Sequence, residues 1–226
     1  MEIIAVSDIH GDMAGIERLA PVLSEADLVL VLGDITNFGG RKEATAVLDR
    51  LERYSKRILA IPGNCDRPEV GALLSERGLN LDQRAVEVGG LWLAGLGGSL
   101  PCPGRTLLEY SEQELAQALK VLGDEISEGW PFVLVCHQPP QGTNLDKVFG
   151  GLHVGSRAIR EFIEKRKPLA CFCGHIHEAS GRDEIGGTII VNPGPLHKGG
   201  YILCGWHETR LKVEIKRGRE KIDGRG

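Results

Sequence analysis

Short apolar runs alternate with amphipathic segments along the first third of the chain. Runs rich in β-branched residues, at 2–7, 28–32 and 57–61, predict three strands. The segments at 13–24, 41–54 and 68–77 carry apolar side chains at the spacing of an amphipathic helix. This alternation is typical of βαβ units, and it predicts an α/β fold with a largely parallel sheet.

The pattern then changes to paired short strands. Runs at 85–88 and 91–95 flank Gly89 and Gly90 and predict a β-hairpin. Further strands are expected, in chain order, at 131–136, at 169–173 and in alternation up to residue 215. The second part of the chain therefore adds more sheet to the fold.

Capping signals predict two more helices. Ser111 and Glu114 have the spacing of a capping box, and Ser156 is placed to cap a helix that ends near residue 165. Neither a linker nor a shift in composition divides the chain, so we expect one domain over 1–216. The basic residues 217–226 lack apolar periodicity and are expected to form a frayed tail.

Five of the predicted strands end in polar loops. The loops read SDIHGD, GDITNFGG, PGNCDRP, HQPPQG and GHIHE, and they begin at residues 7, 33, 62, 137 and 174. In doubly wound sheets such loops gather at the carboxyl ends of the strands, where ligands bind. Polar side chains are therefore expected to meet at one edge of the fold.

The residue types in these loops suit metal ions. Divalent first-row metals that act on phosphate favour imidazole and carboxylate ligands. Asp8 and His10 are two residues apart, so in an extended segment both side chains point to one side. His175 and His177 repeat this spacing after Gly174, which lets the backbone approach closely. Four of the seven histidines fall in these loops, which random scatter would rarely produce.

Each of these residues has a simpler explanation when it is taken alone. An aspartate after a strand, such as Asp34, is more often a helix cap or a turn former. A lone histidine such as His137 is as often a core residue as a ligand. These explanations would all have to hold together at the same edge, so the set as a whole predicts a metal site.

Composition and charge exclude several classes of protein. The net charge of −4, from 27 basic and 31 acidic residues, gives no positive field for nucleic acid. No apolar run approaches the ~20 residues of a membrane span. The apolar stretch 3–6 has no basic segment before it and is soon interrupted by Asp8, unlike a signal peptide, so we expect a cytoplasmic protein. Six cysteines without a Cys-x-x-Cys pair are expected to be reduced.

The motifs DIHGD, GDITN, GNCD, CHQPP and GHIHE, in this order, resemble the five-motif signature of calcineurin-like metallophosphoesterases over residues 2–215. The resemblance implies two mixed β-sheets packed as a sandwich and flanked by helices, in four layers (α-β-β-α). It implies two metal ions, one held by Asp8, His10, Asp34 and His177 and the other by Asp34, Asn64, His137 and His175. Asp34 would then be the bridging carboxylate, because its two oxygens can span two cations.

The same resemblance implies a reaction. A hydroxide bridging the two metals would attack phosphorus in line, and no protein nucleophile is required. Manganese is the metal expected first, although Fe, Zn or Ni would suit the same ligands. The third motif contributes Asn64 and Asp66 to the expected catalytic residues, and the amide of Asn64 could also donate to a phosphate oxygen.

The chain departs from the family pattern at Cys65, where many members carry a histidine that is thought to protonate the leaving group. A general acid contributes about 10²- to 10⁴-fold, so its absence would favour good leaving groups. His153 is the expected catalytic replacement, and His197 is a second candidate. The simpler interpretation of His153 is a surface loop residue.

Three functions are compatible with these features. The first is hydrolysis of a phosphodiester or phosphomonoester of a small molecule. The second is a metal-site scaffold that binds a protein partner without turnover, against which the complete ligand set argues. The third and weakest is a nuclease, since the chain has neither the charge nor the length for extra DNA-binding segments. The substrate and the oligomeric state stay open.

Overall fold

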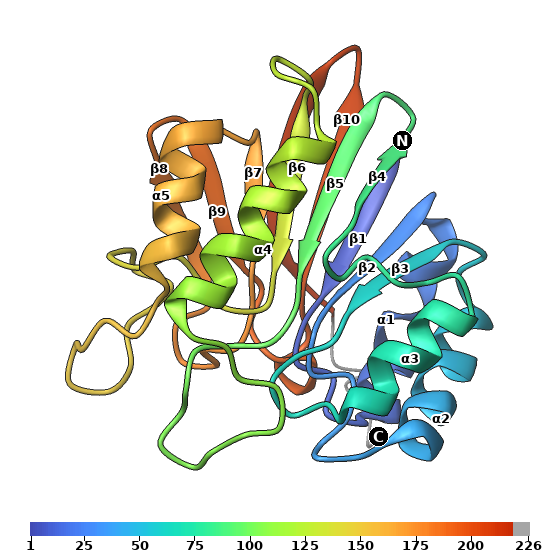
Figure 1. Ribbon diagram of the computed structural model, residues 1–226. Coiled ribbons are helices and arrows are strands. Elements are labelled where there is room, and N and C mark those ends of the chain that lie inside the picture. The colour runs from blue at the N-terminus through green and yellow to red at the C-terminus, as the bar shows by residue number, and fades with distance from the viewer. Residues whose placement is uncertain (219–226) are drawn as a thin grey trace, which may run out of the picture.

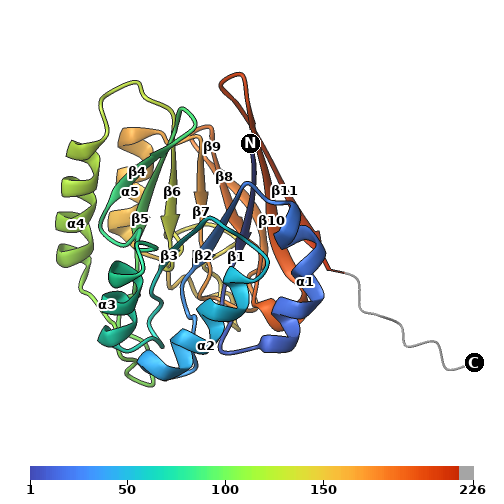
Figure 2. The ribbon, with the colours of Figure 1, turned by 90° about the vertical axis from the view of Figure 1, so that its right-hand side faces the viewer.

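The computed structural model describes residues 1–218 and consists of two β-sheets packed face to face between two layers of helices (Figure 1). One outer layer contains α1 (Met13–Glu25), α2 (Arg41–Glu52) and α3 (Pro68–Glu76), and the other contains α4 (Glu112–Glu125) and α5 (Arg157–Arg166). Figure 2 shows these layers from the side. The predicted four-layer arrangement of two mixed sheets and flanking helices is confirmed.

The first sheet has the strand order β11-β10-β1-β2-β3. Its strands are β1 (Glu2–Val6), β2 (Leu28–Leu32), β3 (Ile58–Ile61), β10 (Gly200–His207) and β11 (Arg210–Arg217). β1, β2 and β3 are parallel, as predicted, whereas β10 and β11 join them antiparallel. The sheet is therefore mixed, and its parallel half delivers three of the polar loops to one edge.

The second sheet has the order β4-β5-β6-β7-β9-β8. Its strands are β4 (Ala85–Val88), β5 (Leu91–Leu96), β6 (Phe132–Cys136), β7 (Ala170–Phe172), β8 (Gly181–Ile185) and β9 (Thr188–Asn192). The four central strands are parallel, and the edge strands β4 and β8 are antiparallel to their neighbours. The predicted hairpin is confirmed as β4 and β5.

Strand β2 explains how the layers hold together. All five of its residues are buried. Leu28, Leu30 and Leu32 face the second sheet and join the core between the sheets. Val29 and Val31 face the other way and pack against the helices. A strand that is apolar on both faces suits the middle of a parallel sheet, because helices and a second sheet cover it.

The ends of the helices follow local capping chemistry. Asp12 caps α1 and accepts a hydrogen bond from the backbone N–H of Gly15 at 2.9 Å. Ser111 and Glu114 form the predicted capping box of α4. Ser156 caps α5, as predicted. These caps fix where the loops that follow the strands turn into helices.

The chain end differs slightly from the prediction. Arg217, expected to begin the tail, pairs with Gly200 as the last residue of β11. The rest of the predicted tail, from residue 219 on, lies outside the described residues. The 3₁₀ helix η1 (Leu196–Lys198) precedes β10. Across residues 1–218, no helix combines the length and apolarity needed to cross a membrane.

Candidate metal centre

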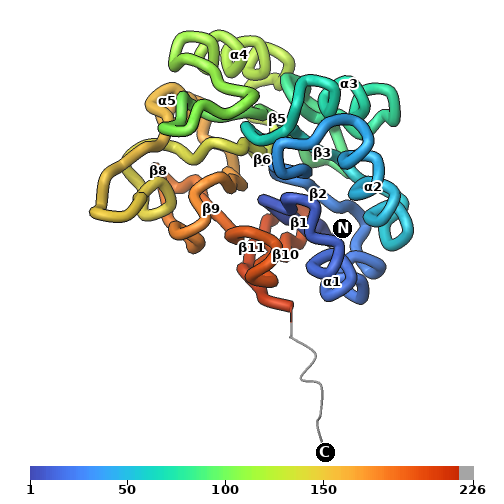
Figure 3. Tube along the Cα trace, turned by 90° about the horizontal axis from the view of Figure 1, so that it is seen from below, coloured from blue at the N-terminus to red at the C-terminus, as the bar shows by residue number. Residues whose placement is uncertain are grey.

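The loops that follow five strands meet at one edge of the molecule, the edge seen in Figure 3. The backbone N–H of Asp8 donates to the carbonyl of Gly33 at 3.1 Å, and that of Gly174 donates to the carbonyl of His137 at 3.1 Å. Between the sheets, the backbone N–H of His175 donates to the carboxylate of Asp8 at 3.2 Å. The sheet topology thus brings distant segments together, as their placement after strands predicts.

Two glycines allow this close approach. A Cβ atom at Gly63 would lie 2.1 Å from Oδ1 of Asp34. A Cβ atom at Gly174 would lie 1.8 Å from Oγ of Ser7 and 2.7 Å from Oδ2 of Asp8. Any side chain there would displace a polar group of the site, so the close backbone approach predicted for Gly174 is confirmed.

Four of the candidate ligands adopt left-handed backbone conformations. The φ angles are 52° at Asp8, 47° at His10, 50° at Asp34 and 66° at His175. For residues other than glycine this conformation costs of order 1–3 kcal/mol and persists only where the surroundings impose it. Its occurrence at four of the candidate ligands makes this edge a candidate functional site.

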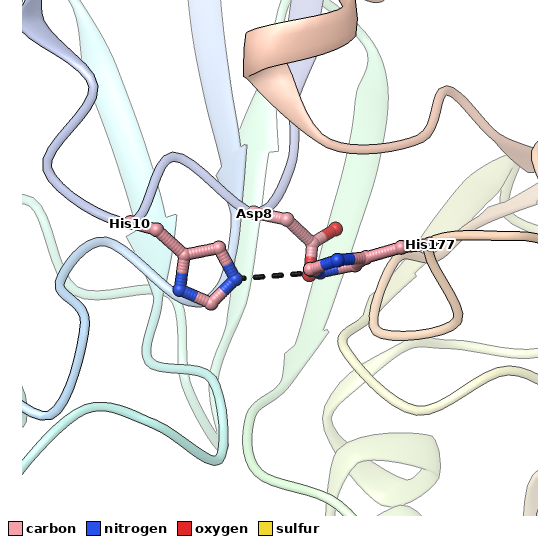
Figure 4. A group of neighbouring side chains, drawn as sticks. All are labelled: Asp8, His10 and His177. Carbon is pink, nitrogen blue, oxygen red and sulfur yellow. Dashed lines mark hydrogen bonds and ion pairs between the residues drawn. The ribbon is translucent and has the colours of Figure 1, made fainter.

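The first cluster consists of Asp8, His10 and His177 (Figure 4). Nε2 of His177 lies 3.1 Å from Oδ1 of Asp8 and 3.3 Å from Nε2 of His10. Two imidazole nitrogens that face each other beside a carboxylate are well placed to share one cation, because each offers a lone pair in its neutral form.

The second cluster is built around His137, which is fully buried. Its Nδ1 lies 2.8 Å from the carbonyl of Leu32, so the ring donates there and turns Nε2 inward. Nε2 lies 2.9 Å from Oδ1 of Asn64 and 3.4 Å from Oδ2 of Asp34. The buried nitrogen therefore faces two oxygens.

The buried charges shift the ionisation of these groups. Burial disfavours the imidazolium of His137, but attraction to Asp34 and Asp8 outweighs it and raises the pKa of His137 to about 10. Burial likewise opposes ionisation of Asp34, but His137 prevails and holds the pKa of that carboxyl well below its usual range. Burial, followed by the nearby positive charge of His137, lowers the pKa of His175 to about 4.

The chemistry of these groups fits divalent metal ions. Ligand atoms converge within 4.8 Å of one another in the sets Asp8–His10–His177, Asp8–Asp34–His137 and His10–Asp34–Cys65. A proton on His137 compensates the negative charge of the buried carboxylates. A bound cation would supply that positive charge instead. Imidazole and carboxylate ligands suit Mn, Fe, Zn and Ni.

His175 lies beside the second cluster. The centroid of its ring is 5.2 Å from that of His137. Nε2 of His175 lies 3.6 Å from Sγ of Cys102, a half-buried residue of the loop after β5. Sequence reasoning missed Cys102, because nothing in its local pattern reports a contact that forms only in the folded chain.

The carboxylate of Asp66, a predicted catalytic residue, is held by hydrogen bonds from two loops. Its buried carboxylate accepts hydrogen bonds from the backbone N–H groups of Gly63 at 2.8 Å, Ile35 at 3.0 Å and Thr36 at 2.8 Å. The hydroxyl of Thr36 donates to it as well, at 2.8 Å. These four bonds occupy the carboxylate and link the loops after β2 and β3. Asp66 is therefore a brace between the loops that carry Asp34 and Asn64.

The two candidate proton donors, His153 and His197, lie in different segments of the chain. His153 follows β6 in the loop before α5, and its Nδ1 lies 2.6 Å from Oδ1 of Asp146. The ring of His197, in η1, lies 6.5 Å from the ring of His177, centroid to centroid. Sequence reasoning missed Asp146, whose pairing with His153 depends on the shape of the loop.

Comparison with known proteins agrees with this architecture. A family model described as a calcineurin-like phosphoesterase superfamily domain matches residues 1–202. An uncharacterized protein of Methanocaldococcus jannaschii is 37% identical over 206 residues, which cover 86% of this chain and 88% of that protein. The phosphodiesterase YfcE of Escherichia coli is 31% identical over 74 residues, 29% of this chain and 40% of YfcE.

Solved structures share the fold. A Thermus thermophilus protein superposes with a TM-score of 0.71 at 22% identity, over 96% of this chain and 99% of that one. At this identity the likeness extends to the arrangement of helices and strands, and the chemistry rests on the residues themselves.

Proposed function

The chain belongs to the calcineurin-like phosphoesterase superfamily, and from this premise we propose that it hydrolyses a phosphodiester or phosphomonoester of a small molecule with two bound metal ions. One ion would be held by Asp8, His10, Asp34 and His177, and the other by Asp34, Asn64, His137 and His175. Asp34 belongs to both sets and would bind both ions.

One observation carries this proposal. Oδ2 of Asp34 lies 3.6 Å from Nε2 of His10 and 3.4 Å from Nε2 of His137. A single carboxylate thus faces one histidine of each proposed ligand set. A carboxylate can serve two cations because it offers two acceptor oxygens and no donor.

When bound, the two cations would activate a shared water as hydroxide and neutralise charge on the phosphate oxygens. The residues of the chain would hold the metal ions and orient the reacting groups. Asn64 would ligate through Oδ1, the atom that already faces His137, and its Nδ2 is then left to donate to a phosphate oxygen. Asp66 would act as a positioning residue, since its bonds hold the loops of Asp34 and Asn64 together.

Cys65 is not the nucleophile in this proposal. Burial raises the pKa of its thiol, and the negative charge of Asp34 raises it further. A protonated thiol is a poor nucleophile. The attacking group is therefore water, and Cys65 cannot replace the family's histidine as a proton donor of matched acidity.

We further propose that the metal is manganese, that the protein acts in the cytoplasm and that its substrate is a small molecule. Nitrogen and oxygen ligands suit Mn, and also Fe, Zn or Ni. All six cysteines are free thiols, which suits a reducing compartment. The net charge of −4 disfavours a polyanionic substrate, and the likeness to the phosphodiesterase YfcE favours a diester.

The test is hydrolysis of bis-p-nitrophenyl phosphate and p-nitrophenyl phosphate by purified protein that has been stripped of metal and reloaded with Mn, Fe, Zn or Ni. We expect turnover of the diester with Mn, loss of turnover in Asp34→Asn, and normal turnover in the matched variant Asp124→Asn, whose side chain is exposed on α4. No turnover with any metal would support the scaffold function instead. Faster cleavage of DNA than of the small diester would support a nuclease.

A further inference from the structure

A second buried carboxylate lies outside the metal centre. Asp146 is fully buried in the loop formed by residues 142–155. Its Oδ2 accepts hydrogen bonds from the backbone N–H groups of Gly142 and Gly155, each at 3.0 Å. Its Oδ1 accepts from the N–H of Thr143 at 2.9 Å and faces Nδ1 of His153 at 2.6 Å. The loop is thus folded around one charged group.

The 142–155 loop is anchored beside the metal centre. Leu145, next to Asp146 in the chain, is buried in the core that also contains Cys136 and Cys173. Cys136 directly precedes His137, and Cys173 lies just before His175. The base of the loop therefore shares a hydrophobic core with the two strand ends that carry these histidines.

The returning end of the loop contacts the same region. The side-chain amide of Gln138, which follows His137, donates to the carbonyl of Val154 at 2.8 Å. Val154 follows His153 in the chain, and consecutive Cα atoms are about 3.8 Å apart. The backbone next to His153 is therefore tied to Gln138, the neighbour of the proposed ligand His137.

The contact with Asp146 determines which nitrogen of His153 is available. Nδ1 is occupied by the carboxylate, so Nε2 is the nitrogen left for proton exchange. The side chain of His153 is 37% exposed, whereas Asp146 is 0% exposed. A buried carboxylate that orients a half-exposed imidazole is the arrangement by which proteins prepare histidine for acid–base work.

We propose that His153 donates the proton to the leaving oxygen and that Asp146 is the positioning residue that orients its ring. This role rests on the phosphoesterase function proposed above, and it supplies the acid that Cys65 does not. As the bond between phosphorus and the leaving oxygen breaks, its electron pair stays on that oxygen. The oxygen takes the proton from Nε2 of the imidazolium, whose N–H electrons become the lone pair of neutral imidazole. Water then reprotonates the exposed ring.

His197 fits this role less well. Its ring lies near that of His177, but no hydrogen bond from its side chain to a carboxylate is found within residues 1–218. Its backbone carbonyl accepts a hydrogen bond from Arg18, a contact that fixes the main chain and does not involve the ring. A ring that no carboxylate orients is less well prepared for proton transfer than that of His153.

The test compares Mn-loaded variants on a series of methyl phosphodiesters whose leaving groups run from p-nitrophenol to simple alkanols. A nitrophenolate leaves without a proton, whereas an alkoxide needs one. We expect His153→Ala to lose about 10²- to 10⁴-fold in kcat on the alkyl esters and to stay close to wild type on the nitrophenyl ester. Asp146→Asn should show the same selectivity with a smaller loss. Asp124→Asn, the same chemical change at an exposed position of α4, should leave the alkyl-to-aryl ratio unchanged.

His153→Asn separates proton transfer from a structural role. The amide of asparagine can replace Nδ1 as a hydrogen-bond donor to Asp146, but it cannot transfer a proton to the leaving oxygen. Wild-type alkyl turnover in His153→Asn would overturn the proposal. An equal loss on both ester types in His153→Ala would also overturn it, as would a selective loss in His197→Ala alone. Absence of any turnover by the wild-type protein would refute the phosphoesterase function itself, and with it the role of His153.

Discussion

Oδ2 of Asp34 lies 3.4 Å from Nε2 of His137, and the two side chains are 3% and 0% exposed. A buried pair of this kind is stable only while both partners remain, because the loss of one leaves an uncompensated charge. In the proposed metal-loaded protein the same two groups would hold one cation between them. Metal binding, the protonation of His137 and the stability of the fold are therefore all expected to depend on this pair.

Metal binding should release a proton from His137. The pKa of about 10 keeps this ring protonated at pH 7 in the metal-free protein, and a ligand must be neutral. Affinity for Mn should therefore rise with pH toward 10, by about tenfold per unit for one proton. Titration calorimetry in buffers of different protonation enthalpy measures that proton directly. The same proton release is expected in His207→Asn, a variant at an exposed position, and its absence in the wild type would contradict the role of His137.

The raised pKa of His137 predicts that the metal-free protein becomes less stable as the pH rises. Because the folded-state pKa of His137 is raised from 6.5 to about 10, its contribution is fully present below pH 6.5 and is lost as the pH rises through 10. Urea unfolding of the metal-free protein between pH 6.5 and 10 should show this decline. A stability that increases across this range would be inconsistent with a protonated His137.

Gly63→Ala should displace Asp34. The added Cβ would lie 2.1 Å from Oδ1 and 2.2 Å from the backbone nitrogen of Asp34, so the loop must shift. Overpacking of this kind costs about 1–3 kcal/mol. We expect lower stability in urea unfolding and weakened metal binding. Gly71→Ala in α3 is the matched control, because nothing lies within 4 Å of its added Cβ, and it should gain about 0.5–1 kcal/mol. Similar behaviour of the two variants would refute the close approach.

Asp66→Asn should loosen the metal centre without touching it. An amide cannot accept all four hydrogen bonds that the carboxylate receives, and unsatisfied buried donors cost about 1–3 kcal/mol. We therefore expect a lower free energy of unfolding together with weaker Mn binding. Asp124→Asn, with the same chemical change on the surface of α4, should alter neither. Normal Mn affinity in Asp66→Asn would show that the brace does not position the ligands.

Periodicity and loop chemistry predicted much of the fold. The run 28–32 became β2 with the predicted bounds, because its apolar residues are buried on both faces. Ser111 and Ser156 cap the predicted helices, since capping depends on a few neighbouring residues. The five polar loops were expected at one edge because each follows a strand, and they meet there.

Contacts between distant residues could not be predicted from the sequence. Cys102 and His175 are 73 residues apart, and their contact depends on how two loops pack. The direction of the Asp66 side chain depends on the turn after β3, and the sequence did not predict that its carboxylate faces the backbone of the neighbouring loop. The sequence did not predict the contact of Asp146 with His153, because an aspartate in a loop usually forms a turn.

The metal content of purified protein tests the central claim most directly. After reconstitution with Mn and removal of excess ion, the wild type and Asp124→Asn should each retain about two ions per chain, as expected of a two-metal site. Asp34→Asn should lose the second ion or both, because Asp34 would serve both proposed positions. Retention of two ions by Asp34→Asn, or of a single ion by the wild type, would contradict a pair of cations that share Asp34.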